Sequence, residues 1–233
     1  MTELRARIKA LAGASAADMV GIAPGEAFTV EELGDLGRGF GPVRSVVVLA
    51  QHIVDPIQMV RFRSGETYQE SRIATVFADA MLRDACWRVV ELLREAGHRA
   101  AIPRNLRYGD SDPRHSISYK RAAVLAGFGA FGRNQLVIHP EWGPWLMLRT
   151  VITDAALPAD ERSAFSPCVG CGRCIEACPS GALLEAGIDR ERCAVGESAT
   201  PSATVLCLSA RGGINCEECL RACPVGVAPP RMR

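Results

Sequence analysis

Apolar residues recur along the chain at two different spacings, and each spacing predicts a different kind of element. An apolar residue at every third or fourth position predicts a helix over residues 2–12 and a longer one over residues 68–96, ending near Gly97. Short, nearly continuous apolar runs predict strands instead. These runs are residues 19–23, 43–53 and 98–102.

The same alternation continues through the middle of the chain. Ser116 or Ser118 is suited to cap a helix that runs to about Ala126, and closely spaced glycines then end it in a tight loop. Strands are predicted over residues 136–140 and 146–154. Helices that alternate with strands are typical of an α/β or α+β domain, which is the fold class we expect.

Composition and charge place the chain among ordinary globular proteins. It has 233 residues, of which 48% are hydrophobic and 23% are charged, with a net charge of +1. This balance gives no basic excess of the kind that binds nucleic acid, so nucleic acid is not an expected partner. The N-terminus lacks a secretory signal, and no apolar run of about 18 residues predicts a membrane span. We therefore expect a cytoplasmic protein with reduced thiols.

The cysteines are concentrated in the last third of the chain. Nine of the ten cysteines lie between Cys168 and Cys223, and Cys86 alone lies earlier, at a position typical of a helix core. This shift in composition predicts two domains. We expect an α/β domain over residues 1–160 and a ferredoxin-like domain over residues 161–233.

The first cysteine motif predicts an iron–sulfur cluster. Cys168, Cys171, Cys174 and Cys178 follow the spacing C-x2-C-x2-C-x3-C-P, which is the pattern of bacterial ferredoxins. In that pattern three thiolates bind one 4Fe–4S cluster and the fourth binds the other. Zinc is the weaker alternative, because its sites usually pair two separated C-x2-C units.

A second cysteine motif, which lacks one cysteine, provides the other half of a two-cluster ferredoxin pattern. Cys216, Cys219 and Cys223 follow C-x2-C-x3-C-P, but Gly213 stands where a further cysteine is expected. Cluster one would then take the first three cysteines of the first motif and the remote Cys223. Cluster two would take Cys178, Cys216, Cys219 and either Cys193 or Cys207. A degenerate second half that leaves only one cluster is the remaining alternative.

Several blocks of the chain resemble the epoxyqueuosine reductase family, which is related to the reductive dehalogenases. The block K-x2-A-x3-G-x-G-x2-G-R-N spans Lys120 to Asn134, and WGPWLMLRTVITD follows it. CVGCGRCIEACPSGAL, DRERC and CEECLRACP complete the resemblance, which runs from about residue 43 to the C-terminus. It implies a nitroreductase-like domain that binds cobalamin and receives electrons from two 4Fe–4S clusters. It also implies that Cys193, in the D-x-R-x-C element, is the remaining ligand of cluster two.

The resemblance also implies a set of cofactor and catalytic residues. The glycine block would let the backbone approach a flat cofactor closely, although a helix end followed by a turn would also explain these glycines. The residues implied for cobalamin binding are Ser118, Lys120, Gly127, Gly129, Gly132, Arg133 and Asn134. Pro113 occupies the position of the family's catalytic aspartate, so Asp112, His115 and Tyr68 are the candidate proton donors.

The function we expect is that of a cobalamin-dependent iron–sulfur reductase. Electrons would come from a ferredoxin or flavodoxin, and the substrate would be a small molecule or a partner protein other than epoxyqueuosine in tRNA. Two alternatives remain at this stage. The chain could be an electron-transfer or reactivating protein that reduces a corrinoid on a partner, or it could be a reductase that binds FMN.

Overall fold

The structure is a computed structural model that describes residues 1–28, 33, 39–53, 66–105, 116–193 and 218–226, without the side chains of residues 66–76, 104, 105 and 116. The chain divides into two compact units. The first, here called the sheet unit, comprises residues 1–52, 78–129 and 146–164. The second, here called the cysteine unit, comprises residues 53–77, 130–145 and 165–233. Each unit is described by itself.

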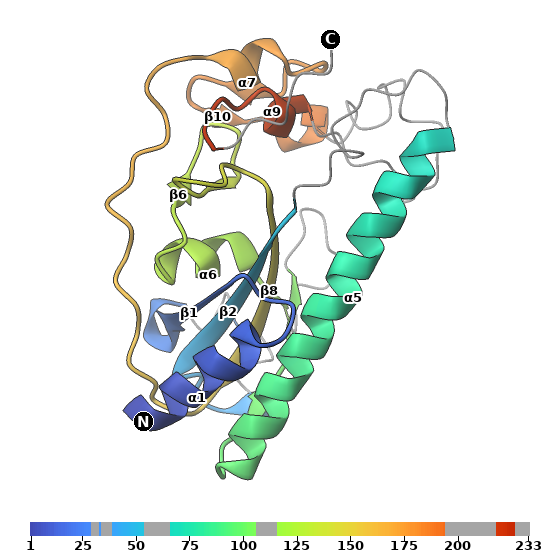
Figure 1. Ribbon diagram of the computed structural model, residues 1–233. Coiled ribbons are helices and arrows are strands. Elements are labelled where there is room, and N and C mark those ends of the chain that lie inside the picture. Colours follow the sequence, from blue (N-terminus) through green and yellow to red (C-terminus); the bar gives the residue numbers. More distant parts are fainter. Residues whose placement is uncertain (29–32, 34–38, 54–65, 106–115, 194–217, 227–233) are drawn as a thin grey trace. The chain divides into compact units, whose positions relative to one another are not determined.

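An antiparallel sheet of four strands forms the centre of the sheet unit (Figure 1). Its order is β1 (Met19–Pro24), β2 (Ser45–His52), β8 (Leu146–Thr153) and β3 (Ala100–Ala101). Residues 45–50 of β2, which lies between β1 and β8, are all buried, because other elements cover both faces of the sheet. This explains the nearly continuous apolar run in the sequence.

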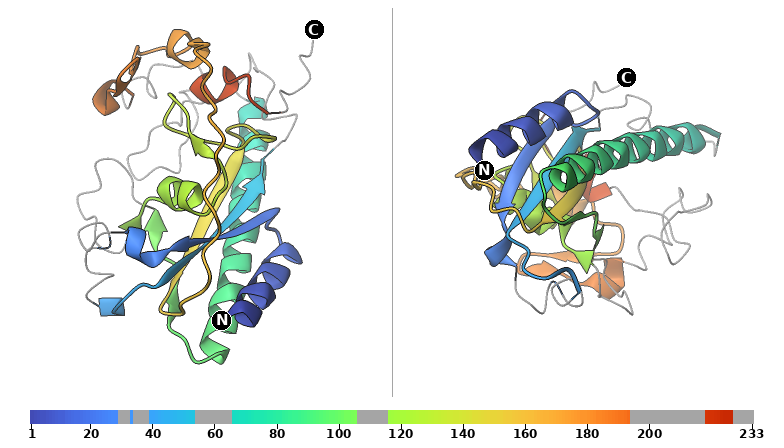
Figure 2. Two further views of the ribbon diagram at one scale, coloured as in Figure 1. Left: turned by 90° about the vertical axis from the view of Figure 1, so that its left-hand side faces the viewer. Right: turned by 90° about the horizontal axis from the view of Figure 1, so that it is seen from below.

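Helices cover both faces of this sheet. On one face lie α1 (Thr2–Gly13) and the part of α5 (Glu66–Glu95) that belongs to the sheet unit (Figure 2). The core on this face includes Leu4, Ile8, Ile22, Val47, Leu49, Leu82, Val89, Leu93 and Val151. The short helix α6 (Tyr119–Leu125) packs against the sheet as well. It lies on the opposite face, because Gly21 of β1 touches Phe128 and Ala126 while the neighbouring Ile22 faces the α1–α5 core.

The predicted elements agree with the observed ones to within a few residues. The helix expected after Ser116 or Ser118 begins at Tyr119 and uses Ser118 as its cap, since the Ser118 hydroxyl accepts from the Arg121 N–H at 3.2 Å. The mixed α/β class is confirmed, whereas the nitroreductase-like label stays a prediction. On α5, Phe77 and Met81 share the apolar spacing of the helix but do not belong to its core. Their exposed fractions are 64% and 53%, because the described core covers the helix only from Leu82 onward.

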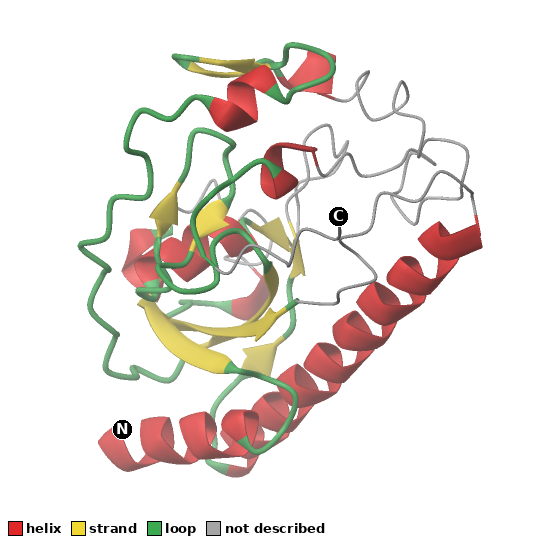
Figure 3. Cartoon of the chain, turned by 45° about the horizontal axis from the view of Figure 1, so that its top comes forward, coloured by secondary structure: helices red, strands yellow, loops and turns green. Residues whose placement is uncertain are grey.

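The cysteine unit is built from short elements joined by loops (Figure 3). Its described strands are β6 (Ala130–Phe131), β7 (Val137–Ile138), β9 (Leu183–Leu184) and β10 (Gly187–Ile188). Its described helices include residues 66–77 of α5, α7 (Arg173–Glu176) and α9 (Glu218–Arg221). Residues 130–145 group with the cysteines, so this division differs from a single break at residue 160. The reason is that β6 and β7 pair with each other and not with the central sheet.

The remaining strands, β4 (Arg104–Asn105) and β5 (Ser116–Ile117), form a short parallel pair. Pro24 leads into a single 3-10 turn, η1 (Gly25–Ala27). In the described part of the chain, no helix has the length and apolar character needed to cross a membrane.

Candidate metal centre

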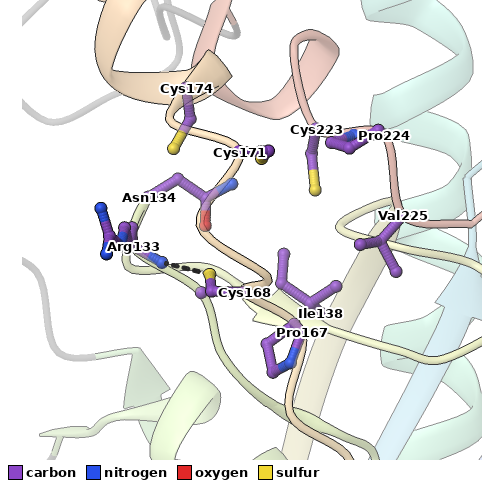
Figure 4. Close-up of a pocket in the computed structure, with 11 residues that line it drawn as sticks. Arg133, Asn134, Ile138, Pro167, Cys168, Cys171, Cys174, Cys223, Pro224 and Val225 are labelled. Atoms are coloured by element: carbon purple, nitrogen blue, oxygen red, sulfur yellow. Dashed lines mark hydrogen bonds between the residues drawn. The ribbon is translucent and has the colours of Figure 1, made fainter.

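Four of the predicted ligand cysteines surround one cavity in the cysteine unit. Cys168, Cys171 and Cys174 of the first motif lie there with Cys223 of the second, as Figure 4 shows. This is the combination expected for cluster one. The remaining lining residues are Gly132, Arg133, Asn134, Ile138, Pro167, Pro224 and Val225.

Local backbone geometry explains how the first motif bends around the cavity. Gly170 and Gly172 lie between the cysteines and have φ angles of +82° and +66°, a region that L side chains rarely adopt. Gly172 also begins α7, because its carbonyl accepts from the Ile175 N–H at 2.9 Å. The glycines of CVGCGRC therefore turn the chain so that three thiols face the same space.

The donor set fits a cluster better than a single ion. Within the described residues, no three His, Cys, Asp or Glu side chains converge closely enough to share one metal ion. The four thiols instead stand around a cavity (Figure 4), and each thiolate of a cubane binds a different iron. A 4Fe–4S cluster therefore suits this cavity, which offers soft thiolate donors in the required number.

The electrostatics of the cavity also favour a bound metal cluster. Burial raises the pKa of Cys174, and the neighbouring Cys168 and Cys171 raise it further. Burial also raises the pKa of Cys223, and the thiols of Cys171, Cys174 and Cys168 add to that effect. Four thiolates gathered here thus repel one another, and the positive charge of iron is what offsets this repulsion.

Cys178 lies outside this cavity and has an environment of its own. Its sulfur accepts from the Ala182 N–H at 3.2 Å and lies 3.8 Å from the Ser180 hydroxyl. Burial opposes ionisation, but backbone N–H groups of Leu183, Ala182 and Ser180 outweigh it and lower the pKa of Cys178. These hydrogen-bond donors therefore make ionisation of Cys178 easier, which suits the position assigned to cluster two.

The other candidates for cluster two are only partly described. Cys219 lies in α9, and Cys193 follows a turn in which its N–H donates to the Asp189 carbonyl at 3.0 Å. Both cysteines are half-buried. Cys216 and Cys207 lie outside the described residues, so the preference for Cys193 stays a prediction.

The residues predicted to contact cobalamin fall into two groups. Ser118, Lys120, Gly127 and Gly129 belong to the sheet unit. There Ser118 caps α6, and Lys120 is half-buried on the same helix. Gly127 has a φ of +83°, and a Cβ on it would lie 2.3 Å from the Glu161 carbonyl oxygen. The end of α6 and the passing chain therefore account for a glycine at this position.

Gly132, Arg133 and Asn134 form the second group, and they lie at the cysteine cavity. The backbone N–H of Arg133 donates to the Cys168 sulfur at 3.3 Å, and its guanidinium pairs with Glu185. The side-chain amide of Asn134 donates to the Cys219 carbonyl at 3.3 Å. Sequence reasoning missed these contacts, because nothing in the spacing of the glycine block shows that it meets segments about 35 and 85 residues further along the chain.

The predicted proton donors cannot be placed. Asp112, His115 and the side chain of Tyr68 lie outside the described part of the chain. His139, in contrast, has a structural role. Its Nδ1 accepts from the N–H groups of Glu141 and Trp142 at 3.2 Å each, and its ring stacks on Trp142.

Comparison with known protein families identifies both cysteine motifs. Two family models, each described as a 4Fe-4S binding domain, match residues 165–184 and residues 214–227. The two matches support two 4Fe–4S clusters and a role in electron transfer.

Comparison with characterised proteins finds epoxyqueuosine reductases. The enzyme of Synechococcus sp. (strain RCC307) is 37% identical over 107 residues, which are 45% of this chain and 33% of the relative. That of Gloeobacter violaceus is 30% identical over 134 residues, which are 55% of this chain and 41% of the relative. The matched segments thus span less than half of each of these two relatives.

Solved structures share the fold at lower identity. Epoxyqueuosine reductase from Streptococcus thermophilus aligns with a TM-score of 0.61 at 16% identity, over 96% of this chain and 66% of that one. A catabolic reductive dehalogenase in complex with 3-bromo-4-hydroxybenzoic acid aligns with a TM-score of 0.62 at 20% identity, over 93% of this chain and 31% of that one. Identities this low show a common fold alone.

One comparison bears on the expected partners. A solved epoxyqueuosine reductase is bound to an epoxyqueuosine-modified tRNA-Tyr stem loop, and it aligns with a TM-score of 0.61 at 20% identity, over 95% of this chain and 65% of that one. The prediction that tRNA is not a partner therefore has no support. The resemblance inferred from the sequence is confirmed: this chain is similar to epoxyqueuosine reductases in sequence, and it shares its fold with them and with a reductive dehalogenase.

Proposed function

We propose that the protein is an iron–sulfur reductase in which two 4Fe–4S clusters deliver electrons to a bound cobalamin, and that its substrate is a small molecule or a group on a partner. The observation that carries the electron-transfer part is the cavity that joins Cys223 to the first three cysteines. Cysteines from both motifs at one cavity are what an interleaved pair of clusters requires.

The clusters would be held by two sets of thiolates. Cluster one takes Cys168, Cys171, Cys174 and Cys223, and cluster two takes Cys178, Cys193, Cys216 and Cys219. The N–H groups around Cys178 and the Arg133 N–H at Cys168 stabilise thiolate charge at both sets. When bound, the clusters supply one-electron transfer, which suits a ferredoxin or flavodoxin as the donor.

Support for cobalamin comes from the relatives. A solved reductive dehalogenase that shares this fold is described in terms of B12-dependent dehalogenation. Ser118, Gly127 and Asn134 each have a structural role of their own, so these three residues add no independent support for a corrinoid. We therefore derive no step through this cofactor. Asp112, His115 and Tyr68 are proposed as proton donors to the substrate, and the cytoplasm, which keeps thiols reduced, as the location.

The same observation favours a second candidate function. If Ser118, Gly127 and Asn134 serve the protein's own structure, the chain can act as an electron carrier that reduces a corrinoid on a partner protein. An FMN-binding reductase is the third candidate. All three use the same clusters and differ in the acceptor.

Cofactor content separates these candidates. The protein would be purified without oxygen, reconstituted with iron and sulfide, incubated with hydroxocobalamin, desalted, and examined by visible and EPR spectroscopy. About eight irons per chain together with a retained corrinoid would support the cobalamin reductase. The same iron content without a corrinoid would overturn it, and co-purified FMN would then favour the flavin enzyme. Substrate screening would include tRNA that carries epoxyqueuosine.

A further inference from the structure

The side chain of Asn134 occupies an unusual position for a neutral polar residue. It belongs to the turn between β6 and β7, its exposed fraction is 5%, and it lines the cavity of the four cysteines. Figure 4 shows its carboxamide among the thiols of Cys168, Cys171, Cys174 and Cys223. A buried amide at such a place needs hydrogen-bond partners.

The turn holds this amide in one orientation. The Asn134 Oδ1 accepts from the Leu136 N–H at 3.2 Å, and its Nδ2 donates to the Cys219 carbonyl at 3.3 Å. A flipped amide would bring donor to donor and acceptor to acceptor. Gly132 fixes the turn from the other side, since a Cβ there would lie 2.7 Å from the Asn134 Oδ1.

The amide nitrogen of Asn134 has a second N–H group that can donate a hydrogen bond. A primary amide nitrogen carries two protons, and among the described residues the Cys219 carbonyl is the one acceptor recorded for Nδ2. A buried donor left without a partner is costly. The sulfurs of an iron–sulfur cluster in this cavity would be acceptors for the second proton.

We propose that Asn134 donates a hydrogen bond from Nδ2 to a sulfur of the cluster held by Cys168, Cys171, Cys174 and Cys223, and thereby raises its reduction potential. Reduction adds negative charge to a cluster, and N–H donors to its sulfurs favour the reduced form. The Arg133 N–H, which donates to the Cys168 sulfur, acts in the same direction from the same turn.

The same amide also connects the two cysteine motifs. Its Nδ2 donates to the backbone carbonyl of Cys219, a ligand proposed for cluster two, while the residue itself lines the cavity of cluster one. Asn134 is thus a positioning residue for electron transfer. The inference rests on the cluster part of the proposed function and does not depend on which acceptor receives the electrons.

The test is a redox titration of the reconstituted protein, followed by EPR, without any corrinoid. In Asn134→Leu we expect the reduction potential of one cluster to fall by about 59 mV. This shift corresponds to a change of about tenfold in the one-electron equilibrium constant. Asn134→Asp should lower the reduction potential further, because a carboxylate repels the added electron. Gln135→Asn is the matched control: it changes the next residue of the turn, whose φ of +59° suits asparagine, and should leave both potentials unchanged. Full iron content with unchanged potentials in Asn134→Leu would overturn the proposal.

A second measurement covers the case in which Asn134→Leu loses its iron. The wild-type protein would be labelled with 15N in asparagine side-chain amides, reduced, and examined by pulsed EPR. The other asparagines are Asn105 and Asn215, and the latter adjoins Cys216, so the experiment would be repeated in Asn215→Ser. A 15N coupling that persists in this variant supports the proposal, and its absence overturns it. A wild-type protein without a cluster signal would overturn the proposed function itself, which is a distinguishable result.

Discussion

At the scale of single residues, Cys223 and Cys86 show how the environment of a cysteine decides its chemistry. Cys223 lines the cavity with the thiols of the first motif, whereas Cys86 lies in the core of α5. Burial raises the pKa of Cys86 to about 12, so it remains an uncharged thiol among apolar side chains. The sequence predicted a core position for Cys86 because it is a lone cysteine at helical spacing without neighbouring ligands, and the structure confirms that position.

The first prediction follows from this contrast. Cys223→Ser should lower the iron content of the reconstituted protein from about eight to about four per chain, because a serine oxygen is a poor ligand for a cluster that prefers thiolates. Cys86→Ser should keep the full iron content and lose stability instead. Iron and sulfide analysis after desalting checks both. Equal iron in Cys223→Ser and the wild type would contradict the assignment of Cys223.

Asp160 is a second residue whose environment sets its charge. Its carboxylate accepts from the Ile22 N–H at 2.7 Å and from Lys9 at 2.8 Å, and it pairs with Arg5. Burial alone would raise the pKa of Asp160, but the groups of Lys9, Ile22 and Arg5 outweigh it and hold the pKa below its ordinary value. One carboxylate thereby ties the segment after β8 to both α1 and β1.

This gives a pH-dependent prediction. A carboxyl group with a lowered pKa stabilises the fold above its unfolded pKa, and that stabilisation is lost as the pH falls through the folded value. Asp160→Asn should therefore reduce the free energy of unfolding at pH 7 by about 1–2 kcal/mol, a figure discounted for partial exposure. The difference from the wild type should shrink below about pH 4. Urea unfolding of the iron-free chain measures this without interference from acid-labile clusters, and a difference independent of pH would contradict it.

At the scale of elements, residues 139–145 meet the segment that follows Cys223. His139 and Gly143 exchange backbone hydrogen bonds of 2.8 and 2.9 Å, which close a tight loop. Gly143 has a φ of +60°, and a Cβ on it would lie 1.9 Å from the Val225 carbonyl oxygen. This loop therefore supports the backbone next to Cys223 from one side.

Gly143→Ala should consequently disturb the metal centre. The added methyl group must displace Val225 as well as strain the backbone, so we expect less iron after reconstitution and a lower melting temperature. Gly181→Ala is the matched control, because Gly181 has nearly the same φ, +61°, with nothing within 4 Å of the added carbon. The control should cost only the backbone strain of about 1–2 kcal/mol. Similar iron loss in both variants would show that strain, and not the contact with Val225, is responsible.

The helices and strands could be predicted from the sequence, but several of the contacts between distant segments could not. Helices over 2–12 and 68–96 and the strand over 43–53 were predicted closely, because periodicity and end signals are local. The spacing of the motifs also predicted that Cys223 joins the first three cysteines, and these four line one cavity, while their role as cluster ligands stays a proposal. The contacts of Arg133 and Asn134 with the cysteine segments could not be predicted, because they depend on how distant segments pack. The exposure of Phe77 and Met81 has the same origin, since periodicity locates an apolar face but not what covers it.

At the scale of the whole molecule, the cysteine unit contains residues 130–145 as well as the two cysteine motifs. Residues 130–145 contribute the Arg133 N–H, the Asn134 amide and the Gly143 loop, and all of them contact cysteine-bearing segments or their neighbours. These segments have few buried apolar residues of their own, namely Pro167, Cys174, Ala182 and Leu183 in the described part beyond residue 164. A core that small rarely holds a fold without further support.

A fragment of residues 161–233 should therefore bind its clusters poorly, although it contains every predicted ligand. After identical reconstitution we expect the full chain to hold about eight irons, the fragment 161–233 to hold clearly fewer, and a fragment 130–233 to lie between them. The intermediate value follows because the longer fragment regains the contacts of Arg133, Asn134 and Gly143 but lacks the sheet to which residues 146–153 belong. Iron content and the rate of cluster loss in air measure this order. Equal retention by the shortest fragment and the full chain would mean that the clusters organise the cysteine segments without help from residues 130–145.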